Sequence, residues 1–195
     1  MVLRRIVRYR GVVHEVITLD QLGRDFTGLF CRRVFRLETL DFYDAENEHE
    51  PYTRFLAGER VDPSWRKPWQ GLVTKVCGSG RIMQRVHVVS EPVTSYVSFS
   101  LLHGYPYNVV AGEDVRILGR AQAGGMCSRG DWWLFDDILA AVLVYDGSGA
   151  VERVEMNDDP VVLAGLCDVM DGALRLAVPL GQYVSEKKIT EKVTA

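Results

Sequence analysis

Five carboxylates gather in one short segment flanked by aromatic residues, and they are the strongest candidates for chemistry in this sequence. They are Asp41, Asp44, Glu46, Glu48 and Glu50, with Phe42, Tyr43, Tyr52 and Phe55 among or just after them. Aromatic neighbours can half-bury a carboxylate, which raises its pKa and makes it a competent base for an amine or alcohol proton. Asp44 and Glu46 are two residues apart, so they would point to the same side of an extended segment. The alternative is a solvated acidic loop without a chemical role.

Three further segments carry charged or aromatic side chains in or beside predicted strands. Glu91 precedes a proline that restricts its backbone, so it is either a positioned acid or an ion-pair partner of Arg85 or Arg116. Arg116 or Arg120 could hold an oxyanion such as carboxylate or sulfate bidentately, or form a structural ion pair. Trp132 and Trp133 are adjacent in a predicted strand and should point to opposite faces. We expect one in the core and the other partly exposed.

Motifs of cofactor and metal chemistry are missing. The cysteines and histidines are scattered and form no C-x-x-C, H-x-x-x-H or H-E-x-x-H pattern, so we expect no metal site and no cofactor. No phosphate loop, G-x-G-x-x-G fingerprint or G-x-S-x-G elbow occurs. These absences argue against phosphoryl transfer from a nucleotide, nicotinamide redox chemistry and acyl transfer.

Composition places the chain among ordinary globular proteins. It has 195 residues, of which 47% are hydrophobic and 25% charged, and a net charge of −3. That charge gives no reason to expect direct nucleic-acid binding. No apolar run reaches the ~20 residues that cross a bilayer, and the basic start lacks the features of a signal peptide. We therefore expect a cytoplasmic protein without membrane contact.

The order of predicted elements indicates the fold class. Helices are predicted from Thr18, at 51–57, from Asp62, at 94–110 and at 160–178, and strands at 31–38, 82–89, 113–120, 132–146 and 150–156, with a Gly-rich loop at 121–130. Asp136-Asp137 at a strand end would cap a turn or bind a cation, with the turn as the default, and the Asp146-Gly147-Ser148-Gly149 segment is a predicted hairpin turn. Elements that do not alternate as βαβα favour a single α+β domain over 1–195, with packed helices on a mostly antiparallel sheet. Residues 1–17 would be a basic strand or arm, and 185–195 a frayed charged tail.

Four stretches taken together resemble an uncharacterised domain family common in actinobacteria. They are FRLETLDFYDAENEHEPYTRFLAGE at 35–59, RVHVVSEPVTSY at 85–96, YNVVAGEDVRILGR at 107–120 and WWLFDD at 132–137. The resemblance spans roughly residues 20–180 and implies one α+β domain without a settled activity. Members often lie near helix-turn-helix regulators, which implies a non-catalytic role as the regulatory binding partner of such a transcription regulator.

The chain departs from the family pattern next to Glu91. His87 stands where the family tends to have arginine, Ser95 where it tends to have aspartate, and Ser98 where it tends to have arginine. These losses of charge fit a remodelled pocket, and neutral drift explains them too.

The chain is also similar to subunits of the aziridine-forming enzymes of azinomycin-like antibiotic pathways, which act as two-chain complexes and eliminate sulfate. This resemblance implies a natural-product biosynthetic enzyme in which an amine attacks the neighbouring carbon and a sulfate ester leaves. An alkylammonium has a pKa near ~10, so a carboxylate must accept its proton. A guanidinium would stabilise the charge that develops on the sulfate.

On this second resemblance Asp44 and Glu46 would be the catalytic residues. The expected substrate-binding residues are Tyr43, Arg54, Arg85, Glu91, Tyr96, Arg116, Trp132 and Trp133. The expected partners are a second small protein subunit and an acidic carrier protein that presents the substrate. The arginines that would receive the carrier are Arg4, Arg5, Arg8 and Arg10. If the chain is the enzyme, Asp44 and Glu46 should converge in a concave pocket with an arginine opposite. If it is the regulatory partner, the two carboxylates should be splayed on a convex face.

Overall fold

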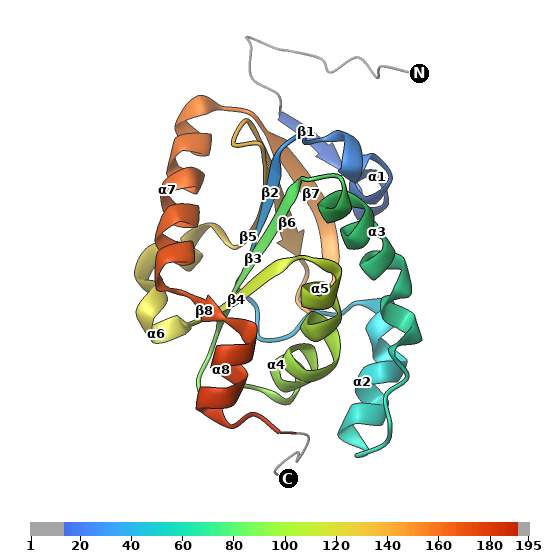
Figure 1. The fold of residues 1–195 in the computed structure, drawn as a ribbon. Helices are drawn as coiled ribbons and strands as arrows, with labels where there is room; N and C mark the ends of the chain where they lie inside the picture. The colour runs from blue at the N-terminus through green and yellow to red at the C-terminus, as the bar shows by residue number, and fades with distance from the viewer. Residues whose placement is uncertain (1–13, 191–195) are drawn as a thin grey trace.

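A computed structural model describes residues 14–190, which form an eight-stranded sheet with helices on both faces (Figure 1). The strands are β1 (His14–Ile17), β2 (Arg33–Glu38), β3 (Ile82–Val89), β4 (Asp114–Gly119), β5 (Asp131–Phe135), β6 (Leu139–Tyr145), β7 (Val151–Asn157) and β8 (Val178–Pro179). Their spatial order is β1-β7-β6-β5-β2-β3-β4-β8. Only β2–β3 and β3–β4 pair in parallel, and the other neighbours are antiparallel. The predicted single α+β domain with a mostly antiparallel sheet is confirmed.

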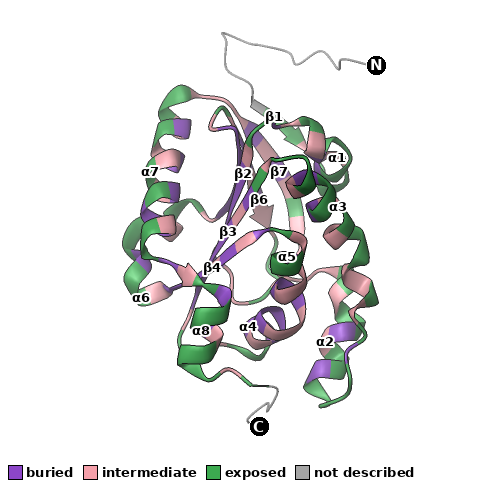
Figure 2. Ribbon diagram, viewed as in Figure 1, coloured by how far each residue is buried: buried purple, intermediate pink, exposed green. Residues whose placement is uncertain are grey.

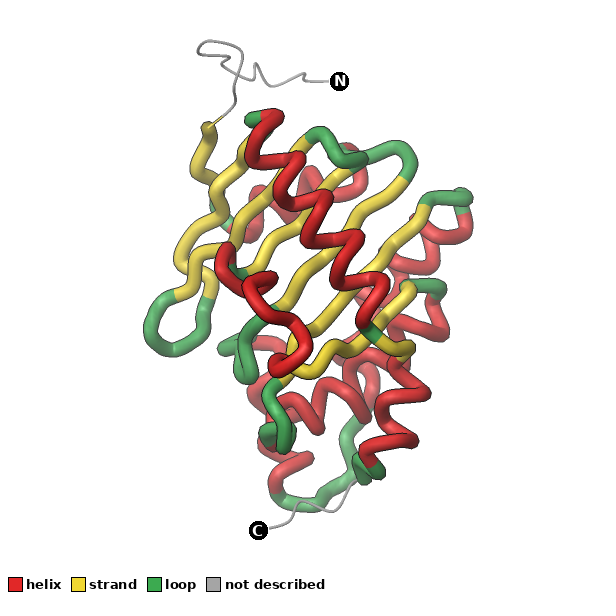
Figure 3. The backbone as a smooth tube through the Cα atoms, turned by 90° about the vertical axis from the view of Figure 1, so that its left-hand side faces the viewer, coloured by secondary structure: helices red, strands yellow, loops and turns green. Residues whose placement is uncertain are grey.

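The helices divide into two layers around the sheet. They are α1 (Leu19–Asp25), α2 (His49–Leu56), α3 (Lys67–Gly78), α4 (Ser95–Phe99), α5 (Tyr105–Ala111), α6 (Arg120–Ala123), α7 (Pro160–Leu176) and α8 (Leu180–Lys187). Helices α6 and α7 cover one face, and α1, α3, α4 and α5 lie on the other (Figures 1 and 3). Short 3-10 turns, among them η1 (Phe26–Gly28), η2 (Glu46–Glu48), η3 (Pro63–Arg66) and η5 (Gly124–Arg129), and a π-helical turn η4 (Ser100–Gly104), join them.

Local capping fixes where the main helices begin. Thr18 and Gln21 form a reciprocal capping box at the start of α1. Asp159 accepts the backbone N–H groups of Val161 and Val162, and Pro160 occupies the first turn of α7. These are the helix starts that the sequence predicts, because each depends only on neighbouring residues.

Strand alternation gives the sheet two different buried faces. Phe35 and Leu37 of β2 belong to a core cluster with Leu166 and Met170 of α7. On the opposite face Val34 packs with residues of α1, η1, α3 and β5. Figure 2 shows buried residues along the central strands and on the inward sides of the helices. No helix within residues 14–190 combines the length and apolarity needed to cross a bilayer.

The predicted Gly-rich loop at 121–130 is largely helical. It forms α6 and η5, and Ala123 is buried in the core cluster beneath α7. Gly124 and Gly130 have positive φ angles of 53° and 64°, so they end these short turns, as glycine does at low steric cost. Packing against α7 therefore outweighs the low helix propensity of glycine. Residues 1–13 and 191–195 lie outside the described part, and with them the predicted arginines of the arm, Arg4, Arg5, Arg8 and Arg10.

The turn predicted at Asp136-Asp137 joins β5 to β6 and also anchors β2. Both residues have positive φ angles, 48° and 65°. The carboxylate of Asp136 accepts the backbone N–H groups of Cys31 (2.6 Å), Arg32 (2.9 Å) and Arg33 (2.8 Å). Burial alone would raise the pKa of Asp136, but these backbone hydrogen bonds outweigh it and hold the pKa below its usual value.

Replacing Asp136 by asparagine should destabilise the fold in a pH-dependent way. A depressed folded-state pKa stabilises the protein above the unfolded pKa of ~3.9, and that contribution disappears as pH falls through the folded value. We expect Asp136→Asn to lower the free energy of unfolding by about 1–3 kcal/mol at pH 7, and the deficit to shrink below about pH 3. Urea unfolding at both pH values measures it. Asp25→Asn is the control, because Asp25 is exposed and its side chain caps no backbone N–H group. An equal loss in both variants would contradict the anchoring role of Asp136.

Candidate functional site

Charged side chains occupy one face of the central strands, where apolar residues would be usual. Arg36 and Glu38 of β2 lie directly opposite Arg85 and His87 of β3 in the parallel register. Alternation places all four on the face away from α7. Each of them is at least 93% buried. Buried charges require partners, so this face must contain a network of ion pairs.

The arginines and carboxylates alternate in that network. Arg85 donates through Nε to Glu113 (2.9 Å) and through Nη1 to Glu38. Glu38 also lies 3.5 Å from Nε of Arg36. Nη2 of Arg36 donates to Asp131 of β5 (3.1 Å). The ion pairs therefore extend from Glu113, just before β4, across β3 and β2 to Asp131 of β5.

The network keeps its central members ionised. Burial alone would raise the pKa of Glu38, but Arg85 and Arg36 outweigh it and hold the pKa well below its usual value. Burial alone would lower the pKa of Arg85, but Glu113 and Glu38 hold it well above its usual value. Both groups therefore carry their charges throughout the physiological pH range.

Tyrosine hydroxyls complete the coordination of the carboxylates. Tyr43 and Tyr145 donate to Oδ2 of Asp131 at 2.7 Å and 3.0 Å. Tyr105 donates to Oε2 of Glu38 at 2.8 Å. Burial raises the pKa of all three phenols, with the neighbouring carboxylates adding to the effect, so they remain protonated donors at neutral pH.

A cavity of about 950 Å³ lies over this charged face. Arg36, Glu38 and Arg85 form its floor. The loop and 3-10 turn before α2 contribute Asp44, Glu46 and Glu48, and further walls come from Tyr43, Arg66, Tyr96, Tyr105, Trp133 and Tyr145. This volume falls within the range of small-molecule sites. The charged and hydroxyl-bearing side chains on its floor and walls suit a charged ligand.

Glu48 is the wall carboxylate with the properties of a base. Its side chain is 18% exposed, and burial raises its pKa despite the hydrogen bond from Tyr96 (2.5 Å) and the Arg66 guanidinium at 3.8 Å. The sequence indicates the acidic segment but not this residue. The i, i+2 argument for Asp44 and Glu46 assumes an extended backbone, whereas Glu46–Glu48 forms the 3-10 turn η2.

Asp44 connects the cavity wall to the β6–β7 turn. Its carboxylate contacts Nε2 of His49 at 2.5 Å and accepts the hydroxyl of Ser148 at 3.2 Å. Its backbone N–H donates to the carbonyl of Gly149 at 3.0 Å. Asp44 therefore has partners of its own and remains one-third exposed at the cavity wall.

Several donors around the cavity have no hydrogen-bond acceptor within residues 14–190. These buried atoms are Nε and Nη1 of Arg36, Nε of Arg66, and the indole Nε1 of Trp65 and of Trp69. Unsatisfied buried donors are costly and uncommon in native proteins. Each of these atoms is shielded from solvent, so an acceptor on a ligand would reach one only after a small rotation of its side chain.

The structure brings together six of the ten predicted site residues. Tyr43, Asp44, Glu46, Arg85, Tyr96 and Trp133 all line the cavity, whereas Arg54, Glu91, Arg116 and Trp132 do not. Arg54 pairs with Glu50 and with Glu59 on the exposed side of α2.

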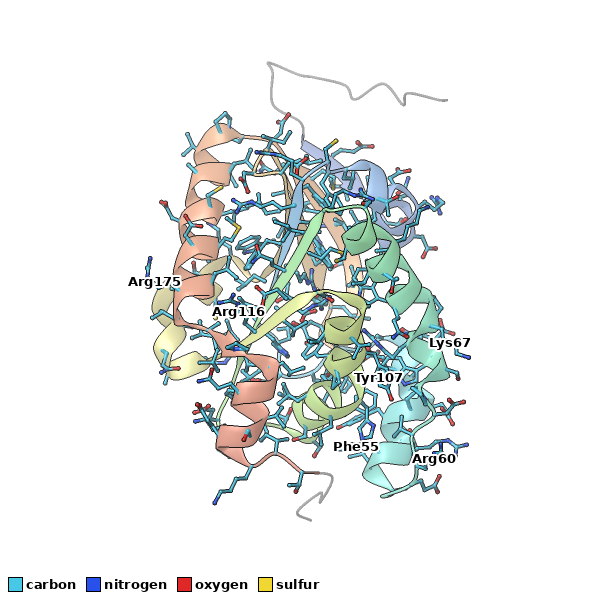
Figure 4. The ribbon with its side chains drawn as sticks, in the orientation of Figure 1. Phe55, Arg60, Lys67, Tyr107, Arg116 and Arg175 are labelled. Carbon is cyan, nitrogen blue, oxygen red and sulfur yellow. The ribbon has the colours of Figure 1, made fainter. Side chains whose placement is uncertain are left out.

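The other three residues lie away from the cavity for structural reasons. Glu91 accepts the Tyr183 hydroxyl (2.9 Å) and pairs with Lys187 (2.9 Å), both in α8. Arg116 donates to the carbonyl of Leu174 in α7 (3.2 Å), and Figure 4 shows it near that helix. Trp132 points to the α7 face because its neighbour points to the cavity.

The two tryptophans correct one detail of the sequence-based expectation. They occupy opposite faces as expected, but neither is partly exposed, since Trp132 is 0% and Trp133 7% exposed. Helices cover both faces of β5, so each face requires a buried side chain. Among the described residues, no group of three or more His, Cys, Asp or Glu side chains is placed to hold a metal ion.

Comparison with protein families matches residues 21–185 to the family described as "Domain of unknown function (DUF6879)". No curated protein matches the chain. Among solved structures, "NucT from Helicobacter pylori" is similar, with a TM-score of 0.46 and 13% identity over 86% of this chain and 99% of that one. The family description therefore carries no activity to this chain.

Arg85→Met should test the ion network. Removing one partner of a buried pair leaves Glu38 and Glu113 with uncompensated charge, so we expect a loss of about 3–5 kcal/mol in the free energy of unfolding. Arg54→Met is the matched control, because its guanidinium is half exposed, and its melting temperature should hardly change. Calorimetric unfolding of both variants measures this. Similar small effects at the two positions would contradict the network.

Proposed function

We propose that this chain, which belongs to the family of domains of unknown function DUF6879, is a subunit of a natural-product biosynthetic enzyme that closes an aziridine ring with elimination of sulfate. The substrate would carry an amine and a sulfate ester on adjacent carbons and would bind in the polar cavity. The resemblance of the sequence to subunits of aziridine-forming enzymes suggests the reaction. The cavity supplies the groups that such a reaction needs.

One observation carries the proposal. The same cavity contains Glu48, a carboxyl with a raised pKa, and has in its floor the guanidinium of Arg36, which is 95% buried and whose Nη1 donates to no acceptor among the described residues. An amine that must lose a proton needs the first group. A departing sulfate needs a cationic donor of the second kind.

Glu48 would act as the general base. It accepts a proton from the substrate ammonium, and the free nitrogen lone pair then attacks the carbon that bears the sulfate ester. The new C–N bond forms as the C–O bond breaks with its electron pair going to sulfate, and the ring nitrogen, neutral after losing its proton, becomes positively charged. Burial suits Glu48 to this role, because a raised pKa strengthens a carboxylate as a base.

The remaining wall residues would bind and orient the substrate. Asp44 and Glu46, the carboxylates predicted from the sequence, would attract the ammonium group at the cavity wall. Arg85 has no partner at Nη2 among the described residues, so together with Arg36 it can hold the sulfate. Holding the amine and the sulfate anti to each other is positional catalysis. In this proposal the chain works in the cytoplasm with a second small subunit and receives substrate from an acidic carrier protein.

Glu48→Gln should abolish most of the activity. We expect sulfate release from the probe 2-aminoethyl hydrogen sulfate to fall by about 10²–10⁴-fold, because glutamine cannot accept the proton. The assay uses the complex purified from its own host through a tag on this chain, with sulfate measured by ion chromatography. Glu50→Gln is the control, since Glu50 pairs with Arg54 outside the cavity and should release sulfate at the wild-type rate.

The pH dependence of activity distinguishes a general-base role of Glu48 from a purely structural one. Wild-type activity should fall as the solution is acidified and Glu48 becomes protonated, with a midpoint above the usual glutamate pKa of ~4.3. That acid limb should be missing from the residual activity of Glu48→Gln. A wild-type complex that binds none of the probe would contradict the proposal, and the role as regulatory partner of a helix-turn-helix protein would take its place.

A further inference from the structure

A second cavity, of about 460 Å³ and mostly apolar, lies beside the polar cavity, and the proposed reaction does not use it. We call it the annex. Leu22, Phe26 and Leu72 line the annex alone. Trp65, Trp69 and Trp133 line both cavities. The two cavities are therefore neighbours that share an aromatic wall, so a ligand whose head lies in one can place a tail in the other where the rings of that wall move apart.

The aromatic wall of the annex is held in a fixed arrangement. The ring of Phe26 meets those of Trp69 and Trp133 edge to face, with centroids 5.6 Å and 4.9 Å apart. Phe26 and Trp133 are only 3% and 7% exposed, so their positions are set by packing. An aromatic ring of a ligand would extend the same edge-to-face pattern, which stabilises aromatic clusters beyond the burial of area alone.

The junction between the two cavities has its own chemistry. The indole N–H groups of Trp65 and Trp69 are buried and have no acceptor within residues 14–190, and both rings border both cavities. A small rotation of either indole would turn its N–H toward the cavities, where an acceptor atom between the charged head and the apolar tail of a ligand would satisfy it. Carbonyl and ether oxygens are such acceptors.

We propose that the substrate carries an aromatic or branched apolar tail that fills the annex, joined through a hydrogen-bond acceptor to the charged head. The identity of that head, an amine beside a sulfate ester, rests on the proposed function. The annex thus selects large substrates: the polar cavity recognises the reacting atoms, and the annex recognises the rest of the molecule. Binding energy from a remote tail can position the reacting atoms.

Two probes with the same head test the tail. They are 2-aminoethyl hydrogen sulfate and 2-amino-3-phenylpropyl hydrogen sulfate, which differ by a benzyl group. Calorimetry on the complex should show the phenyl probe binding about tenfold tighter or more, because burial of a phenyl ring stabilises the bound state. Equal affinities for the two probes would overturn the inference while leaving the proposed function in place.

A leucine at Gly23 should block the annex. Gly23 of α1 lines the annex but not the polar cavity, and a Cβ atom built on it meets nothing within 4 Å. Leucine also forms helix better than glycine, so the fold should tolerate Gly23→Leu. The affinity ratio of the two probes should fall to about one in this variant. Gly71→Leu in α3 is the matched control, because Gly71 also has free space but lines neither cavity, and the wild-type ratio should persist.

A third probe tests the annex without the aminosulfate head. The fluorescence of 8-anilinonaphthalene-1-sulfonate should rise with the wild-type complex and with Gly71→Leu, and much less with Gly23→Leu. If neither aminosulfate binds but this difference holds, the proposed function fails and the annex remains a site for an aromatic group. If the dye responds equally to both leucine variants, the annex is not the binding site and the inference fails.

Discussion

Glu38 is the residue on which the rest of the site depends. The register of β2 and β3 places Arg36 and Arg85 directly opposite each other on a buried face, where two positive charges repel strongly in a low-dielectric interior. Oε1 of Glu38 lies against both guanidinium groups. Glu113 and Asp131 then neutralise the outer sides of the two arginines. Without the central carboxylate, this face could not retain its charges.

The cavity follows from that charged face. Apolar helices pack closely against apolar strands, as α7 does against Phe35 and Leu37 on the other side of the sheet. Packing an apolar helix directly over Arg36 and Arg85 would leave charges without polar neighbours. Instead, tyrosine hydroxyls from the loop before α2, from α5 and from β6 reach the network, and space remains between them. The polar cavity is thus a consequence of where the sequence places charge.

The sequence predicts the fold much better than the site. Helix starts at Thr18 and Asp159, strand 82–89 and the turn at Asp136 follow from local chemistry, and the structure has each of them. The charged face is different, because it depends on which strands are neighbours. Arg36 and Arg85 are 49 residues apart, and only the parallel pairing of β2 with β3 brings them together.

The sequence does not predict which carboxylate of the acidic segment is buried either. The acidic segment is visible as a cluster, but the 3-10 turn at Glu46–Glu48 decides which carboxylate is buried, and that turn has no side-chain cap to predict it. Arg116 and Trp132 lie on the α7 face of the sheet, away from the cavity, because which face of a strand the helices cover is a tertiary property. Sequence patterns therefore identify the residue types, and strand neighbours determine which of them meet.

A crystal structure with 2-aminoethanesulfonate would test the central claim most directly. This molecule has the amine and the anionic sulfur oxygens of the proposed substrate head but no ester bond to break. The account predicts its amine within hydrogen-bonding distance of the Glu48 carboxylate and its sulfonate on the guanidinium groups of Arg36 and Arg85. An empty cavity at saturating ligand, or a sulfonate bound elsewhere on the molecule, would contradict it.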